Sequence, residues 1–204
     1  VGRQANPVGL DALVQAGLKM ERGCVVTNEK METNLPGVYA IGDLVGRTWL
    51  AHVAETEGEI AAENATGHEA LMDYNVIPRP IFTFPEIASV GLTEQQAREQ
   101  NANIKVGKFP WVANGKALAS HETEGFTKVI IGEYGEILGA VIFGPEATNL
   151  ITEYSLAMRA ELTADEILAT IHPHPTLSEA LREAVLAGEG RALHIYQRPA
   201  AARR

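Results

Sequence analysis

Hydrophobic and polar positions in the first third of the chain predict short helices and strands. Leucine and valine recur at helical spacing over 10–18, and a short strand is expected over 24–27. Alanine and glycine form a stripe over 51–66 that predicts a closely packed helix, and its glutamates are expected to form a solvated face. The apolar run 38–41 ends in Gly42-Asp43, the pattern of a buried parallel strand that delivers a polar residue at its carboxyl end. Ligands bind at such ends in open α/β sheets.

A change of composition at 76–80, where two prolines lie close together, predicts a domain boundary. We therefore expect a first domain over 1–75 and a second over 76–204. In the second domain, strands are expected near 104–109 and over 126–131 and 137–143, and helices from Thr93 to about 100, over 149–159 and 163–170, and from about 176 to 186. The last two strands flank a glycine-containing loop and are expected to form a hairpin. The pattern predicts an α/β first domain followed by an α+β domain with an antiparallel sheet.

The composition is typical of a soluble globular chain. Of the 204 residues, 46% are hydrophobic and 21% are charged, and no apolar run approaches the roughly 18 residues that cross a bilayer. Lys and Arg number 17 against 26 Asp and Glu, so the net charge is -9 at pH 7. An acidic chain is a poor match for nucleic acid or an anionic membrane, and we expect neither as a partner.

Cys24 is the only cysteine in the sequence. A single cysteine excludes an internal disulfide and any CxxC metal or redox motif, and no metal site is expected. Such a cysteine is typical of a small buried hydrophobe, and the composition suits a reducing compartment, either the bacterial cytoplasm or an organelle matrix or stroma. The chain begins at Val1 without a methionine, and we expect it to be the middle of a longer protein.

The stretch His172-Pro173-His174-Pro175-Thr176-Leu177-Ser178-Glu179 carries the most chemistry. A proline after each histidine disfavours helical backbone, so His174 should be held just before a helix. Thr176 can cap that helix, and Glu179 in its first turn lies within reach of His174. A histidine paired with a carboxylate is used for proton transfer, because the carboxylate fixes the imidazole tautomer. The same spacing also fits an ordinary capping box after a turn, and from these residues alone both interpretations stand.

Other titratable residues carry no motif. His68, His121 and His194 are expected at the surface. The tail 191–204 holds four arginines and no acid, and it is expected to be frayed or docked on an acidic face.

The segment 172–184 resembles the carboxyl-terminal signature of the dihydrolipoamide dehydrogenases, flavin-dependent enzymes of the pyridine nucleotide-disulfide oxidoreductase family. Three other segments resemble the same family in order: 33–43 its second FAD motif, 50–52 its flavin-side segment, and 84–93 the start of its dimerisation domain. The resemblance covers nearly the whole chain, to about Gly190. It implies the carboxyl-terminal end of an FAD-binding Rossmann-like domain, followed by an interface domain for dimerisation.

The resemblance also implies roles for particular residues. His174 would be the general acid/base and Glu179 its partner. Asp43 would bind FAD, and the flavin would be lined by Trp49, Leu50, Ala51 and His52. Trp49 stands where many relatives carry methionine, so the resemblance supports its backbone position more than its side chain. Without the family, the alternatives are that Asp43 caps a helix and that His52 is an ordinary, partly exposed histidine.

The implied reaction is the oxidation of dihydrolipoamide by NAD through FAD and a redox disulfide. In the family the histidine reaches the disulfide of the other subunit, so a homodimer is expected, and the lipoyl domain of a 2-oxoacid dehydrogenase or glycine cleavage complex would be its partner. This chain holds neither a cysteine pair nor a GxGxxG motif between a strand and a helix, so we expect it to be inactive alone. The alternatives are a non-catalytic dimerisation module and a related disulfide reductase such as glutathione reductase.

Overall fold

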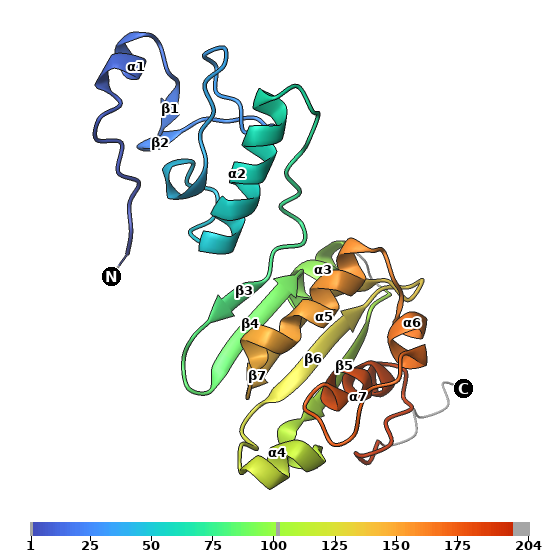
Figure 1. Ribbon diagram of the computed structural model, residues 1–204. Helices are drawn as coiled ribbons and strands as arrows, with labels where there is room; N and C mark the ends of the chain where they lie inside the picture. The colour runs from blue at the N-terminus through green and yellow to red at the C-terminus, as the bar shows by residue number, and fades with distance from the viewer. Residues whose placement is uncertain (1, 101–102, 198–204) are drawn as a thin grey trace. The chain divides into compact units, whose positions relative to one another are not determined.

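A computed structural model of the protein describes residues 2–100 and 103–197 (Figure 1). The chain divides into two compact units, Val1–Tyr74 and Asn75–Arg204. Each unit has its own hydrophobic core.

The first unit is built from short elements around a small core. They are α1 (Asp11–Gln15), the antiparallel strands β1 (Met20–Glu21) and β2 (Cys24–Val25), the 3₁₀ helix η1 (Gly42–Leu44) and α2 (Ala51–Ala65). The core side chains are Leu18, Val25, Ala40 and Val45. These elements confirm the helices predicted over 10–18 and 51–66 and the strand predicted at 24–27. The first helix and the strand are shorter than predicted.

The prediction of a parallel strand over 38–41 is wrong. An extended segment becomes a β-strand only when a neighbouring strand pairs with its backbone. In the described part of the chain, Tyr39 forms an isolated antiparallel bridge with Glu32, and the run joins no parallel sheet. It nevertheless delivers Gly42 and Asp43 into η1, immediately after its last apolar residue.

The second unit is a five-stranded antiparallel sheet with helices. Its strands are β3 (Arg79–Ile81), β4 (Glu86–Gly91), β5 (Lys105–Pro110), β6 (Phe126–Ile131) and β7 (Ile137–Gly144), in the spatial order β3-β4-β7-β6-β5. Its helices are α3 (Glu94–Gln100), η2 (Trp111–Ala113), α4 (Gly115–Ser120), α5 (Ala147–Arg159), α6 (Ala164–Ala169) and α7 (Glu179–Gly188). The predicted antiparallel sheet, its β6–β7 hairpin and the mixed α/β class are confirmed.

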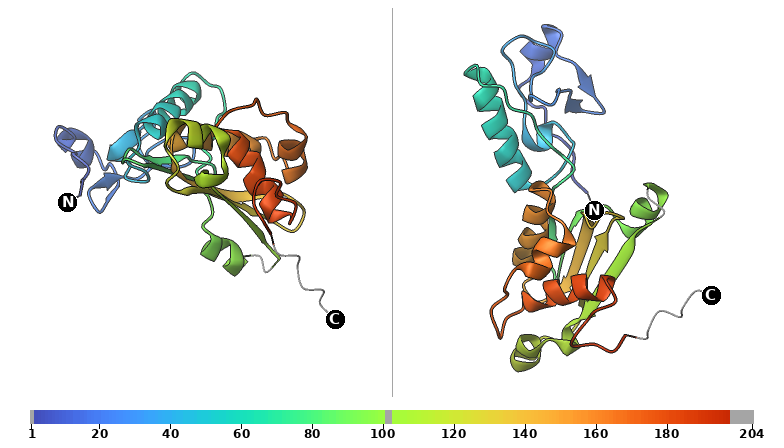
Figure 2. Two further views of the ribbon diagram at one scale, coloured as in Figure 1. Left: turned by 90° about the horizontal axis from the view of Figure 1, so that it is seen from below. Right: turned by 90° about the vertical axis from the view of Figure 1, so that its right-hand side faces the viewer.

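Two helices, α5 and α7, cover one face of this sheet (Figure 1; Figure 2). α5 packs on β4 and β7, whereas α7 packs on β5 and β6. Gly107 in β5 permits the close approach of α7, because a Cβ at this position would collide with the Ala184 carbonyl. The buried Tyr154 hydroxyl on α5 donates a hydrogen bond to the Leu181 carbonyl on α7 at 2.9 Å. These contacts fix α7 on the sheet and, with it, the helix end that carries the predicted site.

The helices of the second unit are short, and local signals set the ends of two of them. At α3, the Thr93 amide donates to Gln96 Oε1 at 2.9 Å and the Gln96 amide donates back to Thr93 Oγ1 at 3.3 Å, a reciprocal capping box. Thr163 and Glu166 form the same box at α6. Among the described residues of the whole chain, no helix is long and apolar enough to span a membrane.

Candidate functional site

His174 lies in the loop between α6 and α7, and Glu179 is the first residue of α7. His174 Nδ1 is 2.9 Å from Glu179 Oε1, and Glu179 Oε2 accepts the Thr176 backbone N–H at 2.8 Å. The His174 side chain is 78% exposed, whereas that of Glu179 is 23% exposed. The structure thus brings together the two residues that the sequence singles out, and the imidazole ring of this chain is accessible.

The same contacts set the charge of Glu179. Burial acts to raise the pKa of its carboxyl, but the Thr176 backbone hydrogen bond, the contact with His174 and the charge of His194 outweigh burial, so this pKa lies below its ordinary value. Glu179 is therefore ionised at neutral pH. Because an ionised carboxylate only accepts hydrogen bonds, Nδ1 of His174 carries a hydrogen and Nε2 is the ring nitrogen that can take up a proton.

The loop that carries His174 is fixed by hydrogen bonds to α4 and within itself. Asn114, the buried N-cap of α4, donates from its side chain to the Thr176 carbonyl at 3.0 Å. The Thr176 hydroxyl donates to the Pro173 carbonyl at 2.6 Å. Because this hydroxyl turns back to the loop, Thr176 does not cap α7, and the helix begins at Glu179 rather than near 176 as predicted.

Two further histidines lie near this pair. The His172 side chain is only 5% exposed, and its Nε2 lies 2.8 Å from Glu153 Oε1 on α5. His194 is 61% exposed, as expected of a surface residue, but its Nδ1 lies 3.0 Å from the buried Glu183 carboxylate on α7. The sequence analysis anticipated neither contact; for His194 the available signal was Glu183, one helical turn after Glu179.

The tail docks on α7 through this buried carboxylate. Glu183 Oε2 accepts the backbone N–H groups of Leu193 and His194, and the Gln197 side chain donates to the Ala187 carbonyl at 2.8 Å. Docking on an acidic group therefore holds for residues 191–197, and the expectation for 198–204 falls outside the described residues. A hollow of about 330 Å³ borders this region, and its polar lining is formed by Thr170, His172, Glu179, Arg182, Glu183 and His194.

In the first unit, Arg3 joins two predicted cofactor residues. Its guanidinium lies 3.6 Å from an Asp43 carboxylate oxygen, donates to the Trp49 carbonyl at 2.6 Å, and stacks over the Trp49 ring. The Asp43 side chain remains half exposed. Asp43 lies inside η1, whose N-cap is Ile41 without a side-chain hydrogen bond, so Asp43 is not a helix cap.

Glu57 on α2 fixes the turn that presents Asp43. It is 1% exposed, and its two carboxylate oxygens accept the Gly42 backbone N–H and the Tyr74 hydroxyl, each at 2.6 Å. Burial, together with the hydrogen bond to Glu57, raises the pKa of the Tyr74 phenol above its ordinary value, so this hydroxyl stays a donor. The expectation that all glutamates of this helix face solvent is therefore wrong for Glu57, because two donors fold over it.

Leu50, Ala51 and His52 form the amino-terminal end of α2. Leu50 is the N-cap, no side chain caps this end, and the first turn holds no acidic residue. The 15-residue helix therefore presents the positive end of its dipole without a compensating carboxylate. Such an end favours a negatively charged group of a ligand.

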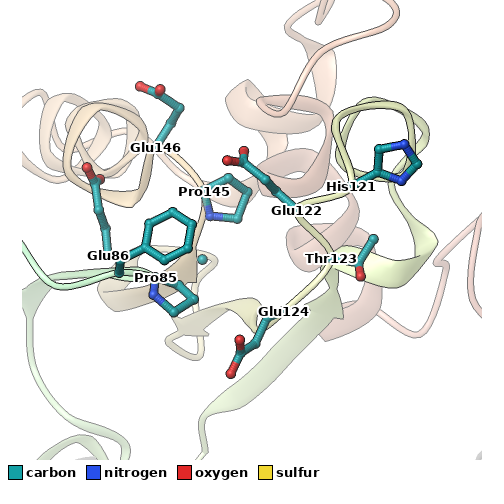
Figure 3. A pocket seen from close by; sticks show the side chains of 10 residues that line it. Pro85, Glu86, His121, Glu122, Thr123, Glu124, Pro145 and Glu146 are labelled. Atoms are coloured by element: carbon teal, nitrogen blue, oxygen red, sulfur yellow. The ribbon is translucent and has the colours of Figure 1, made fainter.

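A second hollow of the second unit, about 290 Å³, lies where β4 and β6 begin and β7 ends (Figure 3). Its acidic lining consists of Glu86, Glu122, Glu124 and Glu146, with His121 beside them. None of the predicted site residues lines it. Among the described residues, no group of three or more His, Cys, Asp or Glu side chains is arranged to hold a metal ion. Cys24 is half-buried. It belongs to the first unit, whereas the His174 loop belongs to the second.

Two family comparisons match the chain. The dimerisation domain of the pyridine nucleotide-disulphide oxidoreductases matches residues 77–185, more than half of the chain and nearly all of the folded second unit. A family described as pyridine nucleotide-disulphide oxidoreductase matches residues 1–58 of the first unit.

Curated relatives and solved structures agree with these matches. Dihydrolipoyl dehydrogenases from Chlamydia pneumoniae and Thermus scotoductus are each 48% identical to the chain over 96% and 97% of its length, and the chain spans only 42% and 43% of theirs. The crystal structure of LpdA from Mycobacterium tuberculosis matches with a TM-score of 0.85 at 29% identity, over 91% of this chain and 41% of that one. The HOCl-induced flavoprotein disulfide reductase RclA from Escherichia coli matches with a TM-score of 0.83 at 28% identity, over 90% and 43% of the two chains.

Proposed function

Because the chain belongs to the pyridine nucleotide-disulphide oxidoreductases, we propose that it forms the carboxyl-terminal part of a dihydrolipoyl dehydrogenase. The longer protein would oxidise dihydrolipoamide with NAD through FAD and a redox disulfide. The observation that carries this proposal is the exposed His174 ring, held at 2.9 Å by an ionised Glu179.

This pair is suited to thiol–disulfide exchange. Only a thiolate attacks a disulfide, and a free thiol, with a pKa of about 8.5, is mostly protonated at neutral pH. Nε2 of His174 takes the proton of a dihydrolipoyl thiol while that sulfur bonds to one sulfur of the disulfide. The S–S bond breaks, and its electron pair leaves with the second sulfur as a thiolate. Glu179 keeps the ring in the correct tautomer and stabilises the imidazolium that forms.

The first unit would hold FAD. The uncapped end of α2, with Leu50, Ala51 and His52, favours negative charge on a ligand, and the half-exposed Asp43 adds a hydrogen-bond acceptor beside it in sequence. Glu57 and Arg3 keep Asp43 in place. FAD and NAD would supply the hydride chemistry, and these residues would bind and orient the flavin.

The redox disulfide must come from cysteines outside this sequence, because Cys24 is the only one here. We therefore place His174 beside a disulfide of the longer protein. The match of 77–185 to a dimerisation domain supports a homodimer. In that homodimer His174 would serve the disulfide of the other subunit. The lipoyl domain of a 2-oxoacid dehydrogenase or glycine cleavage complex would deliver the substrate. The bacterial relatives are compatible with a location in the bacterial cytoplasm.

Two alternatives make different demands on His174. A dimerisation module without catalysis has no use for an exposed histidine paired with an ionised carboxylate. A glutathione reductase would use the same pair on another substrate, but the relatives at 44–48% identity are named dihydrolipoyl dehydrogenases.

The test uses the full-length, FAD-loaded protein that carries residues 1–204 at its carboxyl end. NADH formation from dihydrolipoamide and NAD is compared with NADPH oxidation by glutathione disulfide. The proposal expects the first reaction to dominate and His174→Gln to reduce it by about 10²–10⁴-fold. The exposed His68→Gln, outside the site, is the matched control and should leave the rate unchanged.

The outcomes separate the three candidates. Turnover with glutathione disulfide and not with dihydrolipoamide would assign the protein to the glutathione enzymes. A His174→Gln variant as active as the His68→Gln control would remove the catalytic role and leave the dimerisation module.

A further inference from the structure

His172 is a buried histidine whose two ring nitrogens both face hydrogen-bond acceptors. Nδ1 lies 3.1 Å from the Thr170 carbonyl oxygen, and Nε2 lies 2.8 Å from Glu153 Oε1 on α5. Its side chain is only 5% exposed, so the two ring nitrogens find their hydrogen-bond partners in the protein.

The geometry sets how many protons this group of atoms must hold. A carbonyl oxygen has no proton to give, so Nδ1 must donate to Thr170. The second contact then needs one more proton, either on Nε2 or on the Glu153 carboxyl, because two lone pairs would otherwise face each other. A ring that donates from both nitrogens satisfies the carbonyl and the carboxylate at once.

We propose that His172, protonated on both ring nitrogens, is a positioning residue for the His174–Glu179 pair. The inference rests on the proposed function, because it concerns the same site. His172 ties the loop to α5 on one side of His174, and Thr176 ties it to Asn114 of α4 on the other. His174 therefore projects from a short span anchored at both ends.

The surroundings of the ring can hold its positive charge. Besides Glu153 on α5, the charged or titratable groups that line the adjacent hollow are Glu179, Arg182 and Glu183 of α7 and His194 of the tail. Glu179 is ionised, and Glu183 is already paired with His194. The carboxylates of Glu153, Glu179 and Glu183 thus each have an imidazole partner, in His172, His174 and His194 respectively, so a positive charge on His172 is matched by the negative charge of Glu153.

Two substitutions separate this role from simple packing. In Glu153→Gln, the amide can turn its NH₂ toward Nε2, so a neutral His172 keeps both hydrogen bonds. In His172→Gln, the shorter reach of the side-chain amide does not allow it to donate to both the Thr170 carbonyl and Glu153. One of the two hydrogen bonds that anchor the loop is therefore lost. The charge-neutral network of Glu153→Gln should therefore hold the loop, whereas His172→Gln should release it.

The protonation state is tested on the 204-residue chain itself by NMR of its imidazole nitrogens. The expected result is that both nitrogens of His172 carry hydrogens at neutral pH and that Nε2 loses its hydrogen in Glu153→Gln. Exposed His121 serves as the internal reference signal. A neutral, singly protonated His172 at neutral pH in the unsubstituted chain would overturn the proposal.

The positioning role is tested in the full-length, FAD-loaded protein. We expect His172→Gln to lower the kcat for dihydrolipoamide by about 10–100-fold, the cost of misplacing a catalytic group by roughly 1 Å. Reduction of a dye by NADH, which does not use His174, should be unchanged. Glu153→Gln should stay within about twofold of the unsubstituted protein, like the control Glu161→Gln at an exposed site beyond α5.

A pH profile gives a signature that packing alone would not produce. The kcat of the unsubstituted protein should fall on the alkaline side in step with loss of the second His172 proton seen by NMR, and this limb should be absent in Glu153→Gln. Activity of His172→Gln equal to the control, or Glu153→Gln as impaired as His172→Gln, would refute the role. If His172→Gln does not fold, the NMR result and the Glu153→Gln profile decide. If the unsubstituted protein does not turn over dihydrolipoamide, the proposed function fails while the NMR test still stands.

Discussion

Replacing Glu179 by glutamine should reverse the hydrogen-bond direction at His174. The Thr176 backbone N–H donates to Glu179 Oε2 at 2.8 Å, and it cannot act as an acceptor. The oxygen of the glutamine side chain must therefore take the position of Oε2. The amide NH₂ then takes the position of Oε1, which lies 2.9 Å from Nδ1 of His174. Nδ1 must become the acceptor, and the ring hydrogen moves to Nε2, the atom that would take the thiol proton.

The magnitude follows from losing the base while keeping its geometry. A positioned general base contributes about 10²–10⁴-fold, or about 3–5 kcal/mol of transition-state stabilisation. Glu179→Gln should therefore lower the kcat for dihydrolipoamide by that factor. Both hydrogen bonds are kept in number, so at neutral pH the variant should lose only the stabilisation that comes from the ionised Glu179 carboxylate.

The assay is steady-state oxidation of dihydrolipoamide by the full-length, FAD-loaded protein. Glu122→Gln, an exposed glutamate of the same unit, is the matched control, and urea unfolding checks that Glu179→Gln remains folded. A fall of less than about fivefold would refute the tautomer argument, because a reversed ring cannot accept the proton.

Three other predictions concern stability and are checked by urea unfolding of the 204-residue chain. Glu57→Ala leaves two half-buried donors of the first unit without their acceptor and should lower the free energy of unfolding by about 3–5 kcal/mol, with Glu57→Gln lowering it by about half as much. Equal, small losses in the two variants would show that the carboxylate is dispensable. Asn114→Ala removes the α4 cap and the bond to Thr176 and should cost about 2 kcal/mol, and no shift in midpoint would contradict this. Since the pKa of Glu179 is depressed in the folded state, its ionisation stabilises the chain above pH 4.5, and this stability is lost as the pH falls through the lower folded-state value. In Glu179→Gln, the free energy of unfolding should therefore fall less steeply as the pH is lowered. An unchanged acid dependence would contradict the depressed pKa of Glu179.

The loop around His174 is predictable from sequence because its signals are local. Prolines after two histidines and a glutamate five residues beyond His174 are enough to predict the contact that forms. The hairpin and the caps at Thr93 and Thr163 are local in the same way.

The remaining parts of the site depend on residues that are distant in sequence. Glu57 meets Tyr74 across 17 positions, His172 meets Glu153 across 19, and Arg3 reaches Trp49 across 46. Helical periodicity says which positions repeat on one face, but it does not say which polar side chain from elsewhere will cover that face. The run 38–41 failed for the same reason, since an apolar run indicates burial without naming the strand that would pair with it.

Rapid mixing of the full-length, FAD-loaded protein shows whether His174 is the base for thiol attack. Flavin reduction is followed in single turnovers with dihydrolipoamide or with NADH, for the unsubstituted protein and for His174→Gln. We expect reduction by dihydrolipoamide to slow by about 10²–10⁴-fold in the variant, while reduction by NADH keeps its rate. Equal rates of flavin reduction by dihydrolipoamide in the two proteins would show that His174 is not the base.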